Sequence, residues 1–122
     1  MKQILFIEDN YEIRENTTEL LELAGYTVVT AVNGKEGVAL AKEKTPDLIL
    51  CDIMMPELNG YEVFEELKKD SSTSCIPFVF VTASAERSEM SKGLEMGADG
   101  YIRKPFDEKE LVETIERCLN GK

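Results

Sequence analysis

Residues 48–56 read Leu-Ile-Leu-Cys-Asp-Ile-Met-Met-Pro, and they contain the clearest strand signal in the chain. The stretch begins with an unbroken apolar run, Leu48–Cys51, which is typical of a strand covered on both faces of a parallel sheet. Asp52 follows directly, where the strand is expected to end. Taken alone, Asp52 could simply form a turn before Pro56. The role of Asp52 depends on which residues the fold places beside it.

Four more short apolar runs are spread along the chain. They are Ile4–Ile7, Thr27–Thr30, Phe78–Val81 and Tyr101–Ile102. The runs at 4–7 and 78–81 are continuous and rich in branched or aromatic residues, as expected for buried strands. The runs at Thr27 and Tyr101 are weaker, which favours edge strands.

Five segments with helical spacing lie between and after these runs. The boundaries carry ordinary helix signals: Gly25 ends the first, Pro46 ends the second, and Gly97 ends the fourth. Asn33 with Glu36, and Asp107 with Glu110, have the spacing of a capping box. The apolar positions expected to face the core are Ile13, Leu20, Leu21 and Ala24 in the first; Val63, Phe64 and Leu67 in the third, which follows Asn59–Gly60; Met90 and Leu94 in the fourth; and Leu111, Ile115, Cys118 and Leu119 in the fifth.

Strands that alternate strictly with helices predict an α/β, doubly wound (βα)5 fold. Right-handed crossovers then give a five-stranded parallel sheet with helices on both faces. With the strand order 2-1-3-4-5, the first and third strands are neighbours. We expect residues 1–122 to form a single domain, because composition is even along the chain.

Composition excludes several classes of function. The net charge of −10 disfavours nucleic-acid binding by this domain, because phosphate backbones are repelled. Three widely spaced cysteines and no histidine make a zinc site improbable and remove histidine as a general base. The cysteines, Cys51, Cys75 and Cys118, are expected to be buried small hydrophobes. No run approaches the roughly 20 apolar residues of a membrane span, so a cytoplasmic location is expected.

Polar residues gather where the predicted strands end. Glu8 and Asp9 follow the first strand, Asp52 the third, Thr82 the fourth and Lys104 the fifth. Function in open α/β sheets lies beyond the carboxyl ends of the strands, so these side chains are expected to converge. Three carboxylates in one cleft need a compensating cation. Oxygen ligands alone favour a hard ion such as Mg²⁺.

Each of these residues also has an ordinary structural explanation. Glu8-Asp9 could be a solvated strand end, Thr82 a helix cap, and Lys104 a surface lysine. Their coincidence at one sheet edge is what favours function.

Five motifs, in this order along the chain, resemble those of a known family. The chain from about Ile4 to Leu119 resembles the CheY-like receiver domain of response regulators, a flavodoxin-like fold. The motifs are Ile7-Glu8-Asp9-Asn10, Leu50-Cys51-Asp52-Ile53-Met54-Met55-Pro56 with Asn59-Gly60, Val81-Thr82-Ala83, Gly97-Ala98-Asp99-Gly100-Tyr101 and Lys104-Pro105-Phe106.

The resemblance implies a role for each residue of the site. Asp52 would accept a phosphoryl group from a phosphohistidine. Mg²⁺ (or Mn²⁺) would be held by Asp9, Asp52 and the backbone carbonyl of Met54, with Glu8 acting mostly through bound water. Lys104 would neutralise phosphoryl oxygens. The Lys104–Pro105 peptide is expected to be cis.

The resemblance also implies a switch. The Thr82 hydroxyl would bind the phosphoryl group, and Tyr101 would turn inward into the space vacated. A static edge-strand role for Tyr101 is the alternative. Ala83 would leave the phosphate accessible, and Met54 and Ser84 would tune dephosphorylation. Phosphorylation would then shift the packing of the face formed by the fourth helix, fifth strand and fifth helix.

The implied partners are a sensor histidine kinase or phosphotransfer protein and a downstream effector protein, with no membrane. Such a protein turns over no separate metabolite, so it is a switch rather than an ordinary enzyme. A pseudo-receiver that only binds partners stays open. An FMN carrier is disfavoured because Glu8 and Asp9 would repel its phosphate, and a haloacid-dehalogenase phosphatase because Tyr11 replaces the second acid. A stand-alone protein and an excised domain both fit the ends of the chain.

Overall fold

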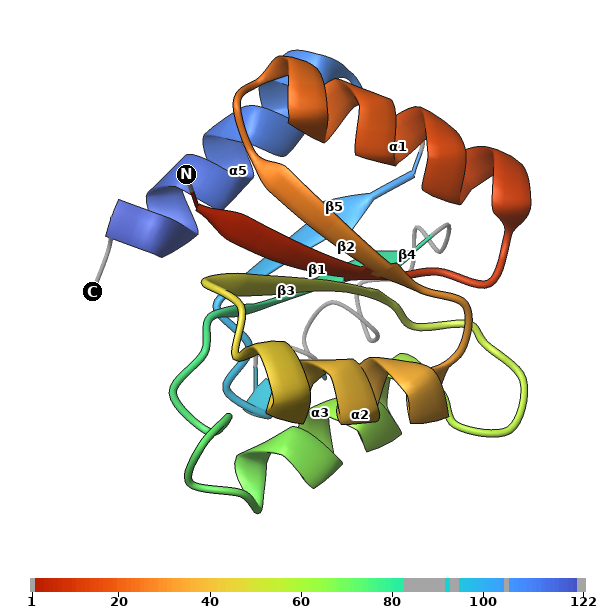
Figure 1. Ribbon diagram of the computed structural model, residues 1–122, viewed down its shortest axis with the longest axis vertical. Helices are drawn as coiled ribbons and strands as arrows, with labels where there is room; N and C mark the ends of the chain where they lie inside the picture. Colours follow the sequence, from red (N-terminus) through yellow and green to blue (C-terminus); the bar gives the residue numbers. More distant parts are fainter. Residues whose placement is uncertain (1, 83–91, 93–94, 105, 121–122) are drawn as a thin grey trace.

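The computed structural model describes residues 2–82, 92, 95–104 and 106–120, which form a sheet between two layers of helices (Figure 1). The strands are β1 (Gln3–Ile7), β2 (Thr27–Ala31), β3 (Leu48–Asp52), β4 (Phe78–Thr82) and β5 (Gly100–Arg103). The helices are α1 (Tyr11–Leu23), α2 (Gly34–Lys44), α3 (Gly60–Lys68) and α5 (Glu108–Asn120). The helix expected around Met90 and Leu94 falls almost entirely outside the described residues.

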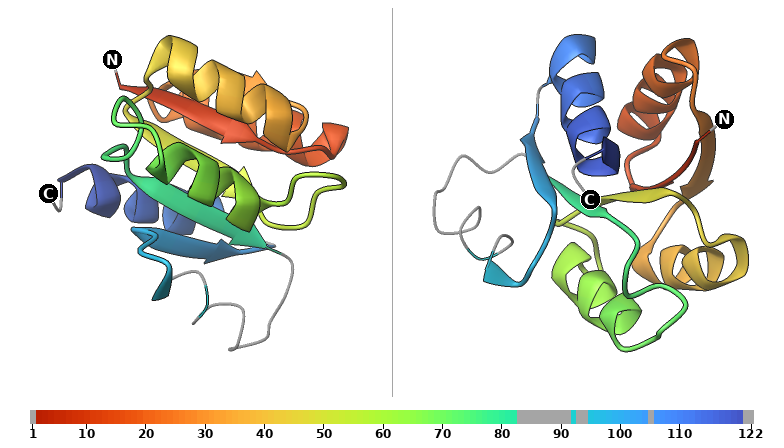
Figure 2. Two further views of the ribbon diagram at one scale, coloured as in Figure 1. Left: turned by 90° about the horizontal axis from the view of Figure 1, so that it is seen from below. Right: turned by 90° about the vertical axis from the view of Figure 1, so that its left-hand side faces the viewer.

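The five strands are all parallel and lie in the order β2-β1-β3-β4-β5, which confirms the predicted topology. The weak runs form the edge strands β2 and β5, as expected. Helices α1 and α5 cover one face of the sheet, and α2 and α3 cover the other (Figure 2). This arrangement places Asp52 at the end of the central strand, with a strand on each side.

The core has two parts, one on each face of the sheet, because alternate strand residues point to opposite faces. One part packs against α2 and α3, and the other packs against α1 and α5. The strand residues of the first are Leu5, Ile7, Ala31, Ile49, Cys51, Phe78 and Phe80. Those of the second are Ile4, Phe6, Leu48, Leu50, Val79, Val81 and Ile102. All four side chains of the run 48–51 are fully buried, which explains why this run is apolar throughout.

The helix ends follow the sequence signals with one difference. Gly25, with φ of 98°, follows α1, and the Asp107 carboxylate accepts the Glu110 N–H at 2.7 Å. The Asn33 side chain accepts the Glu36 N–H as expected, but the Glu36 carboxylate accepts the N–H of Val32 and not that of Asn33. A complete capping box is found instead at Asn59, where α3 begins.

Two expectations about burial are wrong. Ala24, expected in the core stripe of α1, is exposed, because the helix ends at Leu23 and Ala24 is its C-terminal cap. Thr17 is buried on that helix instead. Cys51 and Cys118 are buried as expected, but Cys75 is exposed, because it lies in the connection between α3 and β4. None of the described helices has the length and apolar character required to cross a membrane.

Candidate functional site

Three carboxylates meet at the carboxyl ends of β1 and β3. The two strands are paired so that Ile7 lies beside Cys51, which brings the next residues, Glu8 and Asp52, together. Carboxylate oxygens of Glu8, Asp9 and Asp52 all lie within 4.8 Å of one another. Glu8 is 1% exposed and Asp52 is 4% exposed, whereas Asp9 is open to solvent. The cluster therefore combines two buried carboxylates with a third that is open to solvent.

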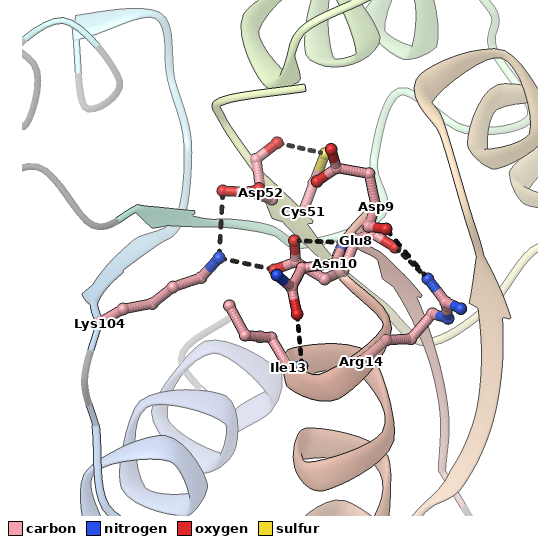
Figure 3. Close-up of polar contacts among 8 residues, drawn as sticks. All are labelled: Glu8, Asp9, Asn10, Ile13, Arg14, Cys51, Asp52 and Lys104. Carbon is pink, nitrogen blue, oxygen red and sulfur yellow. Dashed lines mark hydrogen bonds and ion pairs between the residues drawn. The ribbon is translucent and has the colours of Figure 1, made fainter. Parts of the chain in front are cut away.

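Lys104 reaches the cluster from the end of β5. Its Nζ atom donates a hydrogen bond of 2.6 Å to Oε1 of Glu8 and lies 3.4 Å from Oδ1 of Asp52 (Figure 3). The backbone N–H of Lys104 donates to the carbonyl of Thr82 at 2.7 Å, which fixes this lysine against the end of β4. The ammonium group therefore lies between the two buried acids.

Burial makes these acids unusually weak. Loss of solvent raises the pKa of Glu8 from 4.5 to about 7, and the charge of Asp52 adds to this effect, while the hydrogen bond from Lys104 opposes it. Burial also raises the pKa of Asp52, again against the effect of Lys104. Asp52 must be ionised to act as a nucleophile, so Lys104 favours its reactive form.

The donors fit a hard divalent cation. Three carboxylates face one ammonium group, so the ionised site carries excess negative charge. The three clustered donors are all oxygen atoms, the ligands that Mg²⁺ and Mn²⁺ prefer. The open side at Asp9 leaves room for the water ligands that Mg²⁺ normally keeps. Glu8, Asp9 and Asp52 could therefore hold such an ion.

The two predicted switch residues lie on neighbouring strands. Thr82 is fully buried at the end of β4, one residue after Val81, whose carbonyl accepts the N–H of Ile53 at 3.0 Å. Tyr101 is beside Phe80 in the register of β4 and β5. Its ring is partly buried against the core under α3, and its hydroxyl oxygen is buried. The switch roles of both residues stay predictions.

The remaining predicted residues are placed less closely. Met54 follows β3, and its side chain is 67% exposed beside the site. The predicted role of its carbonyl as a metal ligand stays a prediction. Ala83, Ser84 and Pro105 lie outside the described residues, as does the expected cis peptide before Pro105.

Three contacts at the site were not predicted from the sequence. The thiol of Cys51 donates to the carbonyl of Asp52 at 3.3 Å. Gly60 lies so close that a Cβ atom there would be 2.6 Å from the same carbonyl oxygen. Arg14 donates from α1 to the carbonyl of Glu8 at 2.9 Å. The sequence does hold a signal for Arg14, because a residue early in a helix directs its side chain back toward the preceding loop.

Comparison with known proteins identifies a family. The family model for the response regulator receiver domain matches residues 4–116. The chain is 40% identical to Protein PilH of Pseudomonas aeruginosa over 121 residues, covering 99% of this chain and 100% of PilH. It is 42% identical to the phosphate regulon transcriptional regulatory protein PhoB of the same organism, covering 97% of this chain but 52% of PhoB. The chain thus spans all of PilH and about half of several other relatives.

Solved structures agree with this match. The chemotaxis protein CheY4 of Vibrio cholerae superposes with a TM-score of 0.91 at 30% identity, covering 97% of this chain and 98% of CheY4. The receiver domain of the sensor histidine kinase PA1611 from Pseudomonas aeruginosa gives 0.90 at 29% identity, covering 99% and 98%. That structure has a magnesium ion coordinated in its active site cleft.

Proposed function

Since the chain belongs to the response regulator receiver domain family and is a receiver of two-component signalling, we propose that it is switched by phosphorylation of Asp52. One observation carries this proposal. The ammonium of Lys104 lies between the carboxylates of Glu8 and Asp52, from residues at the ends of three different strands. Such a group, aimed where charge develops during transfer, stabilises the transferred phosphoryl group.

The proposed reaction moves one phosphoryl group. A carboxylate oxygen of Asp52 attacks the phosphorus of a phosphohistidine, the phosphorus–nitrogen bond breaks, and its electron pair returns to the imidazole. The product is an aspartyl phosphate, and the imidazole takes up a proton. Lys104 pairs with a phosphoryl oxygen as that oxygen approaches. Because Lys104 already contacts Asp52, the required movement is small.

A divalent cation completes the proposed site. When bound, Mg²⁺ or Mn²⁺ supplies positive charge that neutralises phosphoryl oxygens. Asp9, Asp52 and the carbonyl of Met54 would hold it, and Glu8 would act mostly through bound water. The cluster of Glu8, Asp9 and Asp52 and the magnesium-bound receiver domain of PA1611 support this assignment.

The proposed output is a change of packing around β5. The hydroxyl of Thr82 binds the phosphoryl group, and Tyr101 follows by packing further inward. The burial of Thr82 and the partly buried ring of Tyr101 support this coupling. The partners are a sensor histidine kinase or phosphotransfer protein upstream and an effector protein downstream. We propose further that residues 1–122 act as one receiver unit in the cytoplasm.

The deciding experiment uses a small phosphodonor. The protein is incubated with acetyl phosphate, with and without Mg²⁺, and its intact mass is measured. We expect a single phosphate adduct that requires Mg²⁺ and is lost in Asp52→Asn. Glu57→Gln, which removes an exposed acid from the nearby loop, is the matched control and keeps the adduct.

The competing function is a pseudo-receiver that only binds partners. It predicts a folded protein with no adduct under any of these conditions. That result would reject the proposal, and so would an adduct that persists in Asp52→Asn.

A further inference from the structure

A side chain from α1 holds the backbone that carries two of the three acids. Nη1 of Arg14 donates a hydrogen bond of 2.9 Å to the carbonyl oxygen of Glu8 and makes a longer contact of 3.5 Å with the carbonyl oxygen of Asp9 (Figure 3). Both carbonyls lie beyond β1, which ends at Ile7. Among the residues that the structure describes, Arg14 is therefore the donor that reaches these carbonyls beyond the end of the strand.

Asp9 depends on this support more than its neighbours do. Glu8 is fixed by Lys104, but in the parts of the chain that the structure describes, the Asp9 carboxylate accepts no hydrogen bond and forms no ion pair. It nevertheless lies within 4.8 Å of the other two carboxylates. Its position must follow from its backbone. That backbone is held by Arg14 and by the N–H of Asn10, which donates to Oε2 of Glu8 at 3.3 Å.

Local structure explains why Arg14 reaches this loop. The Asn10 side chain caps α1 by accepting the Ile13 N–H at 3.0 Å, and the N–H of Arg14 donates to the Asn10 carbonyl at 2.9 Å. Side chains on a helix lean toward its N-terminus, so Arg14 extends back over the loop. The guanidinium carbon lies 5.6 Å from the centre of the Tyr11 ring, which limits its freedom further.

We infer that Arg14 is a positioning residue of the metal site, holding the loop backbone so that the Asp9 carboxylate is set for a small divalent cation. The inference rests on the proposed function, because it assumes the same site. Arg14 has two opposite effects on cation binding, one through its charge and one through the position of Asp9. A guanidinium near a cation site repels the cation, so removing charge alone strengthens binding, whereas losing the position of Asp9 weakens it.

The test compares two cations. Dissociation constants for Mg²⁺ and Ca²⁺ are measured by titration calorimetry on the full chain and on Arg14→Met, Arg14→Lys and Arg117→Met. We expect Arg14→Met to weaken Mg²⁺ binding about tenfold, as for other residues that orient metal ligands. Ca²⁺ binding weakens much less, because Ca²⁺ accepts irregular geometry and Mg²⁺ does not.

The other variants set the controls. Arg14→Lys keeps the charge and one donor, so we expect a smaller loss of Mg²⁺ binding. Arg117→Met removes the same charge from an exposed position in the last turn of α5 and should shift neither constant. Urea unfolding shows whether each variant is folded. If Arg14→Met is unfolded, the test rests on Arg14→Lys and on the ratio of its dissociation constants for Mg²⁺ and Ca²⁺.

Three results would overturn the inference. Unchanged or tighter Mg²⁺ binding in Arg14→Met would show that charge, and not position, governs its effect. Equal weakening of Mg²⁺ and Ca²⁺ would indicate a general structural role. A wild-type chain that bound no Mg²⁺ would overturn the proposed function as well, whereas normal wild-type binding with either of the first two results would overturn only the inference.

Discussion

Lys104 and Glu8 are 96 residues apart in the chain, yet Nζ of one donates to Oε1 of the other at 2.6 Å. Their side chains are 13% and 1% exposed, so both charges are shielded from water. Asp52 lies 3.4 Å from the same ammonium. One lysine therefore compensates two buried carboxylates, and the stability of the metal-free fold depends on it.

Replacing Lys104 by methionine should destabilise the protein at pH 7.5. The substitution leaves Glu8 and Asp52 buried without their cation, a loss of about 3 kcal/mol in the free energy of unfolding. Saturating Mg²⁺ should restore part of the loss, because the ion replaces the missing charge. Urea unfolding with and without Mg²⁺ measures both effects. Lys109→Met, at an exposed position of α5, is the control, and an equal loss in that variant would refute the explanation.

The stability of the metal-free protein should fall as pH rises from about 4.5 to about 7. Glu8 has a pKa of about 7 in the folded protein and 4.5 when unfolded, so the folded state binds a proton that the unfolded state has already lost. This contribution is fully present below 4.5, amounts to about 3 kcal/mol at most, and is gone above 7. The raised pKa of Asp52 acts in the same direction.

Urea unfolding at a series of pH values without Mg²⁺ measures how the free energy of unfolding changes with pH. Glu8→Gln should remove most of this pH dependence and leave the part that is due to Asp52. Stability that instead rose with pH across this window would contradict the proton-binding argument.

Replacing Gly60 by alanine should disturb the site where α3 packs against the end of β3. The added Cβ would lie 2.6 Å from the Asp52 carbonyl oxygen and 2.8 Å from Cα of Ile53, so α3 or the end of β3 must move. We expect a loss of about 2 kcal/mol in stability, as for overpacked cores, and slower adduct formation from acetyl phosphate. Glu65→Ala, at an exposed position of the same helix, is the control. Normal phosphorylation in Gly60→Ala would show that the contact does not position Asp52.

Removing only the hydroxyl of Thr82 should separate phosphorylation from its readout. Valine has nearly the same shape, so Thr82→Val should stay folded, within about 1.5 kcal/mol of the wild type. Asp52 should still be phosphorylated in this variant, but the NMR signals of the Tyr101 ring should no longer shift on phosphorylation. Thr82→Ser keeps the hydroxyl and should keep the shift. A Tyr101 response that survived in Thr82→Val would exclude the hydroxyl as the link.

The sequence predicts the strands well because each strand can be recognised from its own apolar run. The run Leu48–Cys51 must be buried on both faces, and the weak runs at Thr27 and Tyr101 must lie at edges. The strand order then brings Glu8, Asp9 and Asp52 together without any knowledge of side-chain geometry.

What the sequence misses depends on three-dimensional contacts between elements. Gly60 is a plausible helix start in the sequence, and only packing of α3 against β3 shows how closely it approaches Asp52. Cys75 stands just before Ile76 and the apolar run at 78–81 but lies exposed in the connection between α3 and β4, whereas Cys51 is buried in the central strand. Arg14 has an ordinary helix position, and its role comes from the loop that its side chain covers.

Asp52 ends the central strand of the sheet, whereas Tyr101 lies on the edge strand β5. Mutations that accumulate on the outer surface of β5 therefore leave the neighbours of Asp52 intact. If β5 reads out phosphorylation as proposed, a duplicated gene can acquire a new partner through changes on this edge strand, while the cluster around Asp52 stays the same.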